Sequence, residues 1–187
     1  MAAYPKGAVD MEIKGKRVII IGERDGIPGP AIEAAIQSVG GDPILVRTQC
    51  FVWTSAGTLD PEGQEEIRSL VEEHGPEGMI VLLGSPTPES TEIFARTVTE
   101  GDPTWVGPLA GTALRLPVYH ILEPSIKEQI PPTIYDEQVG IMESVLDVAD
   151  LVQVVQKVRD TSGWYPTCRI KSLRFLLFES LTAPQLS

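Results

Sequence analysis

The sequence contains one cysteine whose surroundings suit chemistry. Cys50 lies in the stretch TQCFVWTSAG, residues 48–57, and Trp53 follows it at the third position. This is the spacing of the Cys-x-x-Cys redox motif, in which two sulfur atoms form and break a disulfide. Indole has no ionisable group that could replace the second sulfur, so Cys50 and Trp53 cannot perform thiol–disulfide exchange. On this pattern alone, Cys50 is either a reactive thiol or a buried core cysteine.

Other reactive arrangements are weaker. His74 and His120 are isolated in the sequence, and the absence of a Cys/His/Asp cluster argues against a metal site. The segment GERDGIPGP, residues 22–30, could receive an anion where it opens a helix. It lacks the lysine and the spacing of a P-loop, and Pro28 and Pro30 remove two amide donors. A structural turn and an anion-binding loop are equally compatible with it.

Expected strands and helices alternate four times along the chain. Buried-type apolar runs predict strands, and helical spacing of apolar residues predicts helices. The expected strands are KRVIIIG, DPILVRT, GMIVLLG and LPVYHIL, and the expected helices are PGPAIEAAIQSVGG, residues 61–74, PESTEIFARTVTEG and residues 136–159. This alternation predicts a three-layer α/β fold with a mostly parallel sheet of about four strands, of the flavodoxin or Rossmann kind.

This topology predicts where reactive groups gather. Right-handed crossovers place every strand-to-helix connection at one edge of the sheet, and open α/β sheets bind ligands at that edge. Four connections qualify: residues 22–30, 48–57, 84–90 and 123–128. Cys50 therefore falls at the functional edge and close to a helix N-terminus, which stabilises a thiolate.

Composition fits a single cytoplasmic domain. The 187 residues are 42% hydrophobic and 22% charged, which suffices for one core. The net charge of -11 disfavours nucleic acids and anionic membranes as partners. Two cysteines are too few for a disulfide scaffold, no signal-peptide pattern is visible, and the apolar runs are too short to span a bilayer. We expect residues 1–12 to be a flexible extension, 13–160 one domain and 161–187 a tail.

The connection GDPTWVGPLAG, residues 101–111, is long and rich in Gly and Pro. Such a connection is typical of a lid or of a loop that docks a partner. The alternative is a rigid surface loop in which Trp105 acts as a hydrophobic plug.

Four segments together closely resemble selenoprotein A of the bacterial glycine reductase complex, a family that also serves the sarcosine and betaine reductases. They are KRVIIIGERDGIPGPAIE, TQCFVWTSAGTLD, VTEGDPTWVGPLAG and YDEQVGIMESVLDV, and the similarity runs through about residues 13–160. In that family the second motif reads Cys-Phe-Val-selenocysteine-Thr. Cys50 matches the family cysteine, Trp53 falls on the selenocysteine, and Trp105 matches an aromatic position.

Selenocysteine is encoded by UGA, a codon that some genetic codes read as tryptophan. We hypothesise that Trp53 is a decoded UGA and that the natural residue is selenocysteine. Family members end near the equivalent of residues 159–163, so Trp164 is interpreted as a second UGA and the tail as read-through. The tail has three basic residues and one acidic residue, unlike the rest of the chain. If Trp53 is instead a true substitution, the chain is a non-catalytic relative that still docks to its partners.

The resemblance implies a redox-active carrier subunit of the reductase. A selenol at position 53 takes a carboxymethyl group from protein B as a selenoether and passes it to protein C, where acetyl phosphate forms. The cycle ends with a selenenyl sulfide between Cys50 and position 53, which thioredoxin reduces. No metal or organic cofactor is implied beyond the selenium itself. The rival interpretations are a flavodoxin-like module that binds a small molecule through residues 22–30, and a non-catalytic scaffold.

Overall fold

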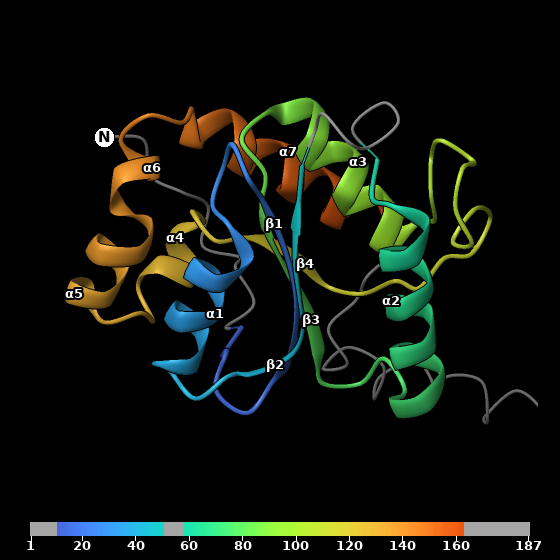
Figure 1. Cartoon of the computed structure of the whole chain (residues 1–187), viewed down its shortest axis with the longest axis horizontal. Helices are drawn as coiled ribbons and strands as arrows, with labels where there is room; N and C mark the ends of the chain where they lie inside the picture. Colours follow the sequence, from blue (N-terminus) through green and yellow to red (C-terminus); the bar gives the residue numbers. More distant parts are fainter. Residues whose placement is uncertain (1–10, 51–57, 163–187) are drawn as a thin grey trace, which may run out of the picture.

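A four-stranded parallel sheet forms the centre of the protein (Figure 1). The structure is a computed structural model and describes residues 11–50 and 58–162. The strands are β1 (Arg17–Glu23), β2 (Asp42–Gln49), β3 (Met79–Gly84) and β4 (Val118–His120), in the order β2-β1-β3-β4. All three strand pairings are parallel. The predicted α/β fold with a mostly parallel sheet is confirmed.

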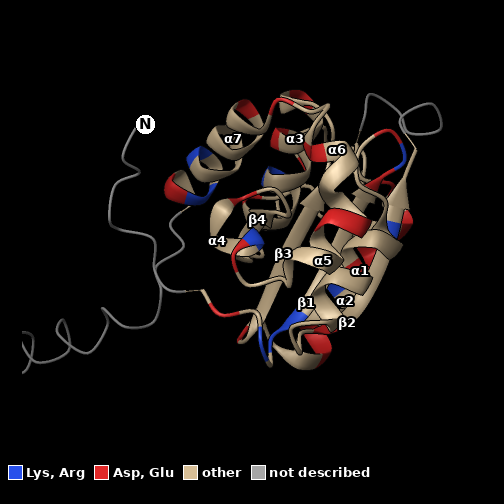
Figure 2. Cartoon of the chain, turned by 90° about the vertical axis from the view of Figure 1, so that its left-hand side faces the viewer, with Lys and Arg blue, Asp and Glu red and all other residues tan. Residues whose placement is uncertain are grey.

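Helices cover both faces of the sheet and complete three layers, as Figures 1 and 2 show from two sides. Several begin with proline at the first positions, where its missing N–H has no intrahelical partner to lose. The helical elements are α1 (Gly29–Gln37), α2 (Pro61–His74), α3 (Pro88–Thr99), α4 (Pro124–Lys127), α5 (Pro132–Tyr135), the π-helical turn η3 (Asp136–Gly140), α6 (Ile141–Glu143) and α7 (Val148–Thr161). None of the helices in this part of the chain is both long and apolar enough to cross a membrane.

The single helix expected over residues 136–159 is wrong. The structure divides it into η3, α6 and α7. Ser144 donates its hydroxyl hydrogen to the carbonyl of Ile141 at 2.6 Å, and Asp147 accepts a hydrogen bond from the amide of Asp150 at the start of α7. Side chains of Ser and Asp that bond to nearby backbone groups compete with helix continuation, so the chain restarts as a new helix at this point.

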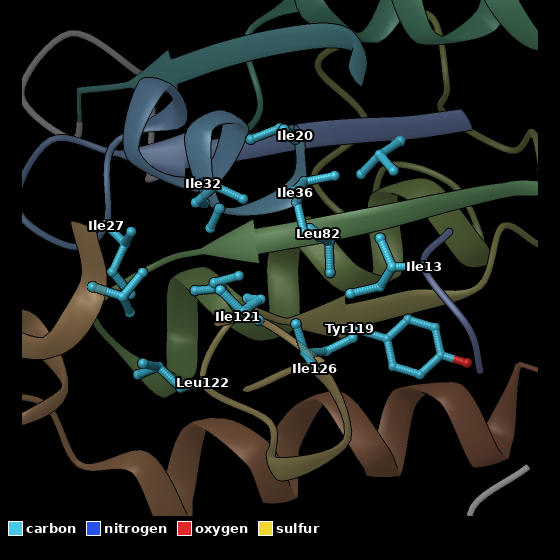
Figure 3. Close-up of a cluster of buried hydrophobic side chains, with 14 of the residues drawn as sticks. Ile13, Ile20, Ile27, Ile32, Ile36, Leu82, Tyr119, Ile121, Leu122 and Ile126 are labelled. Carbon is cyan, nitrogen blue, oxygen red and sulfur yellow. The ribbon is translucent and has the colours of Figure 1, made fainter. Parts of the chain in front are cut away.

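Alternation along β1 builds one hydrophobic cluster on each face of the sheet. Val18 and Ile20 point to the face covered by α1, whereas Ile19 and Ile21 point to the opposite face. Figure 3 shows the first cluster, which includes Ile13, Ile32, Ile36, Leu82, Tyr119 and Ile126. The second contains Ile67, Leu83, Phe94, Leu109 and Val155. Because β1 is buried on both faces, it positions the ends of its neighbours β2 and β3 firmly.

Candidate functional site

Cys50 follows β2 directly and so lies at the carboxyl edge of the sheet, where the topology predicted it. It is half-buried and has a free thiol. Trp53, the other predicted site residue, lies outside the described residues, as do Trp164, the remaining tail beyond residue 162 and residues 1–10 of the expected extension. The part of the site that the structure describes consists of Cys50 and the elements on both sides of the 50–57 connection.

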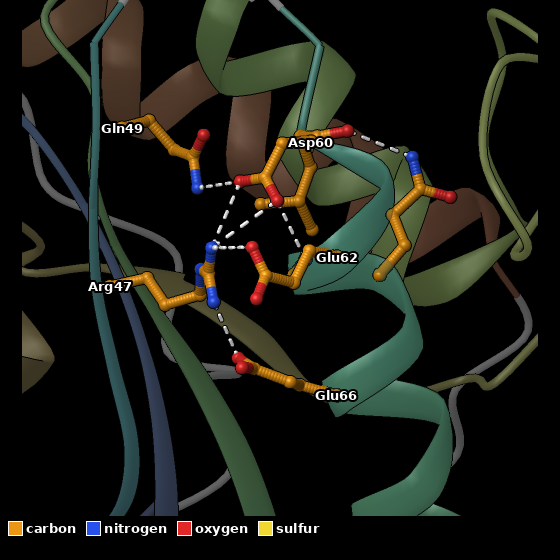
Figure 4. Close-up of polar contacts among 8 residues, drawn as sticks. Arg47, Gln49, Asp60, Glu62 and Glu66 are labelled. Atoms are coloured by element: carbon orange, nitrogen blue, oxygen red, sulfur yellow. Dashed lines mark hydrogen bonds and ion pairs between the residues drawn. The ribbon is translucent and has the colours of Figure 1, made fainter.

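Asp60 links the two ends of that connection (Figure 4). Its carboxylate accepts a hydrogen bond from the side-chain amide of Gln49, the last residue of β2, at 2.8 Å. The other carboxylate oxygen accepts from the amide of Gly63 at 2.8 Å, which caps the N-terminus of α2. One side chain thus fixes the end of β2 to the start of α2 and sets the positions between which the Cys50 segment runs.

Arg47 strengthens this link from β2. Its guanidinium lies 3.3 Å from Asp60, 2.7 Å from Glu66 and 3.7 Å from Glu62. Burial by itself would raise the pKa of Asp60, but the Gly63 amide, the Gln49 amide and Arg47 outweigh it and hold the pKa below its ordinary value. The Asp60 carboxylate is therefore ionised at neutral pH.

The loop between β1 and α1 uses its amides within the protein. Three of its amides donate to oxygens of the chain itself: Gly26 to Glu23 O at 3.1 Å, Ile27 to Gly84 O at 2.8 Å and Gly29 to Thr48 Oγ1 at 2.9 Å. A Cβ at Gly26 would overlap the carbonyl of Gly84, so the loop also packs directly onto the end of β3. These contacts favour the structural-turn interpretation of residues 22–30 over the anion-binding one.

Glu23 is a functional candidate that the sequence pattern did not single out. It ends β1 and is paired in register with Gln49, so it occupies the same edge as Cys50. Its side chain is buried, and its Oε2 has no hydrogen-bond partner among the residues of the described ranges. Burial is the largest influence and raises its pKa; the Ser90 hydroxyl opposes this and Asp25 adds to it. Burial thus favours the protonated form of Glu23 more than in an exposed glutamate. The sequence did contain a signal for Glu23, because an acidic residue there ends a strand that is buried on both faces.

His120 serves the fold. The ring is fully buried, its Nε2 lies 3.0 Å from the carbonyl of Ser85, and its Nδ1 accepts from the amide of Leu122 at 3.2 Å. The carbonyl partner requires the proton on Nε2. Burial lowers the pKa of His120 to about 4, so the ring is neutral near pH 7. In residues 11–50 and 58–162 no group of three His, Cys, Asp or Glu side chains gathers that could hold a metal ion.

These features define a class of protein: a small parallel α/β domain that carries its cysteine on a strand-to-helix connection at the carboxyl edge. Comparison with known proteins narrows the class. Residues 13–159 match the family model described as glycine reductase complex selenoprotein A. The chain belongs to this family, as its motifs predicted.

Named relatives agree with this assignment. The chain is 51% identical over 150 residues to the glycine/sarcosine/betaine reductase complex component A of Symbiobacterium thermophilum. The aligned residues cover 80% of this chain and 97% of the relative. It is 50% identical over 153 residues to the component A of Carboxydothermus hydrogenoformans, covering 82% of this chain and 98% of that protein. The component A of Treponema denticola is 48% identical over 150 residues, covering 80% and 96% respectively. No solved structure is a significant match to the chain.

Proposed function

We propose that this chain is the redox-active carrier subunit of a glycine, sarcosine or betaine reductase. The observation that carries the proposal is the position of Cys50, the cysteine of the family motif, at the carboxyl edge of the sheet directly after β2. Membership of the selenoprotein A family supports a selenocysteine at position 53, where the sequence has tryptophan. The proposed setting is the cytoplasm, with proteins B and C of the reductase and thioredoxin as partners.

The first proposed step transfers a two-carbon group to selenium. The selenolate at position 53 attacks the methylene carbon of a substrate whose nitrogen is held on protein B. A carbon–selenium bond forms, the carbon–nitrogen bond breaks, and the amine leaves with the bonding pair. A selenol is more acidic than a cysteine thiol, whose pKa is ~8.5, so it is ionised at neutral pH where the thiol mostly is not. This difference is the physical reason for selenium at that position.

The second proposed step reduces the carbon on protein C. The Cys50 thiolate attacks selenium, a sulfur–selenium bond forms, and the carbon–selenium pair stays on carbon, which takes a proton and becomes a methyl group. In the same step one carboxylate oxygen leaves as water and a thiol of protein C is acylated, which gives an acetyl thioester; phosphate then displaces that thiol and forms acetyl phosphate. Thioredoxin supplies two electrons to reopen the bond between Cys50 and position 53 by thiol exchange. The subunit needs no metal or organic cofactor for either step.

The Asp60 link supports this chemistry. Cys50 and position 53 must meet to form the bond that ends the cycle, so the connection between β2 and α2 must start and end at defined points. Asp60 supplies this by bonding Gln49 on one side and Gly63 on the other. We further propose that residues 13–160 are the functional domain and that the tail is read-through. The family match ends at residue 159, before the tail.

The test compares the chain as written with a Trp53→selenocysteine form, in the presence of proteins B and C, thioredoxin and phosphate. We expect acetyl phosphate from the selenocysteine form, weak activity from Trp53→Cys, and none from the tryptophan form. Cys50→Ser in the selenocysteine form should accumulate the carboxymethyl adduct, detectable by mass, without releasing acetyl phosphate. Equal production by the tryptophan and selenocysteine forms would refute the proposal and favour a scaffold role.

A further inference from the structure

The side chain of Glu23 is a buried carboxyl with an oxygen that the fold does not use. Glu23 ends β1 and is only 3% exposed, and its Oε2 has no hydrogen-bond partner among residues 11–50 and 58–162. Burying a polar oxygen without a hydrogen bond costs free energy, and such atoms are rare in folded proteins. A group that is kept at this cost at the reactive edge is a candidate for a role in the chemistry.

The backbone places Glu23 beside Cys50. Glu23 is paired in register with Gln49 across β1 and β2. The amide of Arg24 donates to the carbonyl of Gln49 at 2.9 Å, so the peptide group after Glu23 is hydrogen-bonded to the peptide group before Cys50. Because β2 ends at Gln49, strand alternation does not fix the direction of the Cys50 side chain. Glu23 and Cys50 thus follow directly from bonded positions at the ends of two adjacent strands.

The groups around Glu23 suit a carboxyl that changes its protonation state. On α3 the Ser90 hydroxyl favours the ionised form, whereas Asp25 in the connection after β1 opposes it. On β2 the side chain in register is the neutral Gln49, and Arg47 is paired with acidic side chains at the start of α2. Burial is the largest influence and raises the pKa of Glu23. A raised pKa makes the carboxylate a better proton acceptor than an exposed glutamate.

The proposed second step needs a proton acceptor at Cys50. An ordinary thiol, with a pKa of ~8.5, is mostly protonated at neutral pH and must lose its proton to attack selenium. The sequence has two histidines, and neither serves. His120 has both ring nitrogens bonded inside the fold. His74 ends α2 beside Arg17, the first residue of β1, and so lies at the opposite edge of the sheet.

We propose that Glu23 is the proton acceptor and donor for Cys50 in the reductase cycle. As the Cys50 sulfur bonds to selenium, its proton passes to the free oxygen of the Glu23 carboxylate, and the carbon that keeps the carbon–selenium pair takes a proton from water. When thioredoxin reopens the bond, its two thiols become a disulfide and release their protons to water. The Cys50 sulfur then leaves with the bonding pair and takes its proton back from Glu23, and selenium is left as the selenolate.

This inference rests on the proposed function and deepens it, because it names the group that moves the proton. Glu23 returns to its starting state after each cycle. It acts only where Cys50 gains or loses a proton, so the first proposed step, in which the selenolate attacks the substrate, does not depend on it. The two steps can therefore be measured separately to test the role of Glu23.

The test uses the Trp53→selenocysteine form as the parent. Mass spectrometry follows formation of the carboxymethyl adduct with protein B and its amine substrate. The isolated adduct is then mixed with protein C and phosphate, and acetyl phosphate is measured in a single turnover. Glu23→Gln keeps the size of the side chain but cannot accept a proton. We expect it to form the adduct at the parent rate and to release acetyl phosphate about a hundredfold more slowly, the scale of general acid–base catalysis.

The pH profile of acetyl phosphate release separates proton transfer from a structural role. Release by the parent should rise as the pH increases through the pKa of Glu23. Glu23→Gln should lack this rise and should gain rate only at higher pH, where a thiol ionises without a proton acceptor. Glu23→Asp keeps a carboxyl on a shorter side chain, so it should retain the rise with an intermediate rate.

Glu89→Gln is the matched control. Glu89 is exposed in the first turn of α3, next to Ser90, so the change removes a carboxylate near the same edge and leaves Glu23 in place. Both of its rates should equal those of the parent. Release by Glu23→Gln with the rate and pH profile of the parent would overturn the inference and leave the proposed function standing. Equal slowing of adduct formation and release would also overturn it, because it would show a structural role. Failure of the parent to form the adduct would overturn the proposed function itself.

Discussion

Replacing Asp60 by alanine should loosen both ends of the connection that carries Cys50. The substitution removes the cap of α2 and the acceptor of the Gln49 amide, and it separates Arg47 from one of its three carboxylates. Loss of an N-cap costs about 1 kcal/mol. A buried amide left without its acceptor costs about 1–3 kcal/mol, and Gln49 is buried.

The ion pair adds little to this sum. Arg47 and Asp60 are both partly exposed, and pairs of this kind contribute less than about 1 kcal/mol. The expected total for Asp60→Ala is therefore about 3 kcal/mol, a large part of the 5–15 kcal/mol typical of such domains. Asp60→Asn is the matched control. Its single amide oxygen can keep the Gly63 cap, but its NH2 group then faces the Gln49 amide, so the variant loses the Gln49 hydrogen bond and the charge and should cost about 2 kcal/mol.

Urea unfolding followed by circular dichroism measures both differences. The pKa of Asp60 is lower in the folded chain than its ordinary value of 3.8. The ionised carboxylate therefore stabilises the fold above pH 3.8, and this stabilisation is lost as the pH falls through the pKa of the folded chain. The difference in free energy of unfolding between the unaltered chain and Asp60→Asn should thus have its maximum value at pH 7 and decrease below about pH 4. If Asp60→Ala unfolds within about 0.5 kcal/mol of the unaltered chain, the link described here does not hold the segment.

Three further predictions concern buried ionisable groups. Arg159→Met should destabilise the protein by about 3–5 kcal/mol in urea unfolding, because it leaves the buried Glu123 carboxylate, which Arg159 contacts at 2.9 and 3.0 Å, without its cationic partner. The double variant Arg159→Met with Glu123→Gln should recover most of the lost stability. No recovery would contradict the pairing. His120 should titrate in NMR near its lowered pKa of about 4, and a titration near pH 6.5 would contradict its burial. The free energy of unfolding should fall as the pH drops from about 6.5 through about 4, and His120→Gln should reduce this fall. Glu23 has a raised folded pKa, so its neutral form favours folding below 4.5 and the benefit is lost as the pH rises through the folded value. Glu23→Gln should therefore be at least as stable as the unaltered chain at pH 8, and a loss there would show that the ionised carboxylate has a stabilising partner.

The order of strands and helices could be predicted because its signals are local. RVIIIG and MIVLLG read as strands buried on both faces, and each has that burial in the structure. The fourth strand was expected over LPVYHIL, yet only Val118–His120 pair with β3. The neighbouring Leu116 and Leu122 are buried by packing alone, and Ile121 adds only one bond from its amide to Leu83 O of β3; an apolar run cannot reveal where pairing stops. The break near Asp147 likewise depends on side chains that compete with the helix backbone.

The position of Cys50 could be predicted from topology, because any connection after a parallel strand lies at the carboxyl edge. The Asp60 link could not, because it depends on which side chains of β2 and α2 meet in space. The outward orientation of Trp105 was equally hidden. The Gly- and Pro-rich loop was compatible both with a lid or partner-docking loop and with a plug formed by Trp105, and the 75% exposure of Trp105 decides against the plug.

The most direct test of the central claim is the mass of the protein purified from its native source, with peptide mapping across residues 50–57. The account predicts selenium at position 53, recognised by its isotope pattern, and a chain that ends near residue 163. Tryptophan at position 53 together with the full tail would contradict it, because the chain would then have no selenolate to receive the carboxymethyl group.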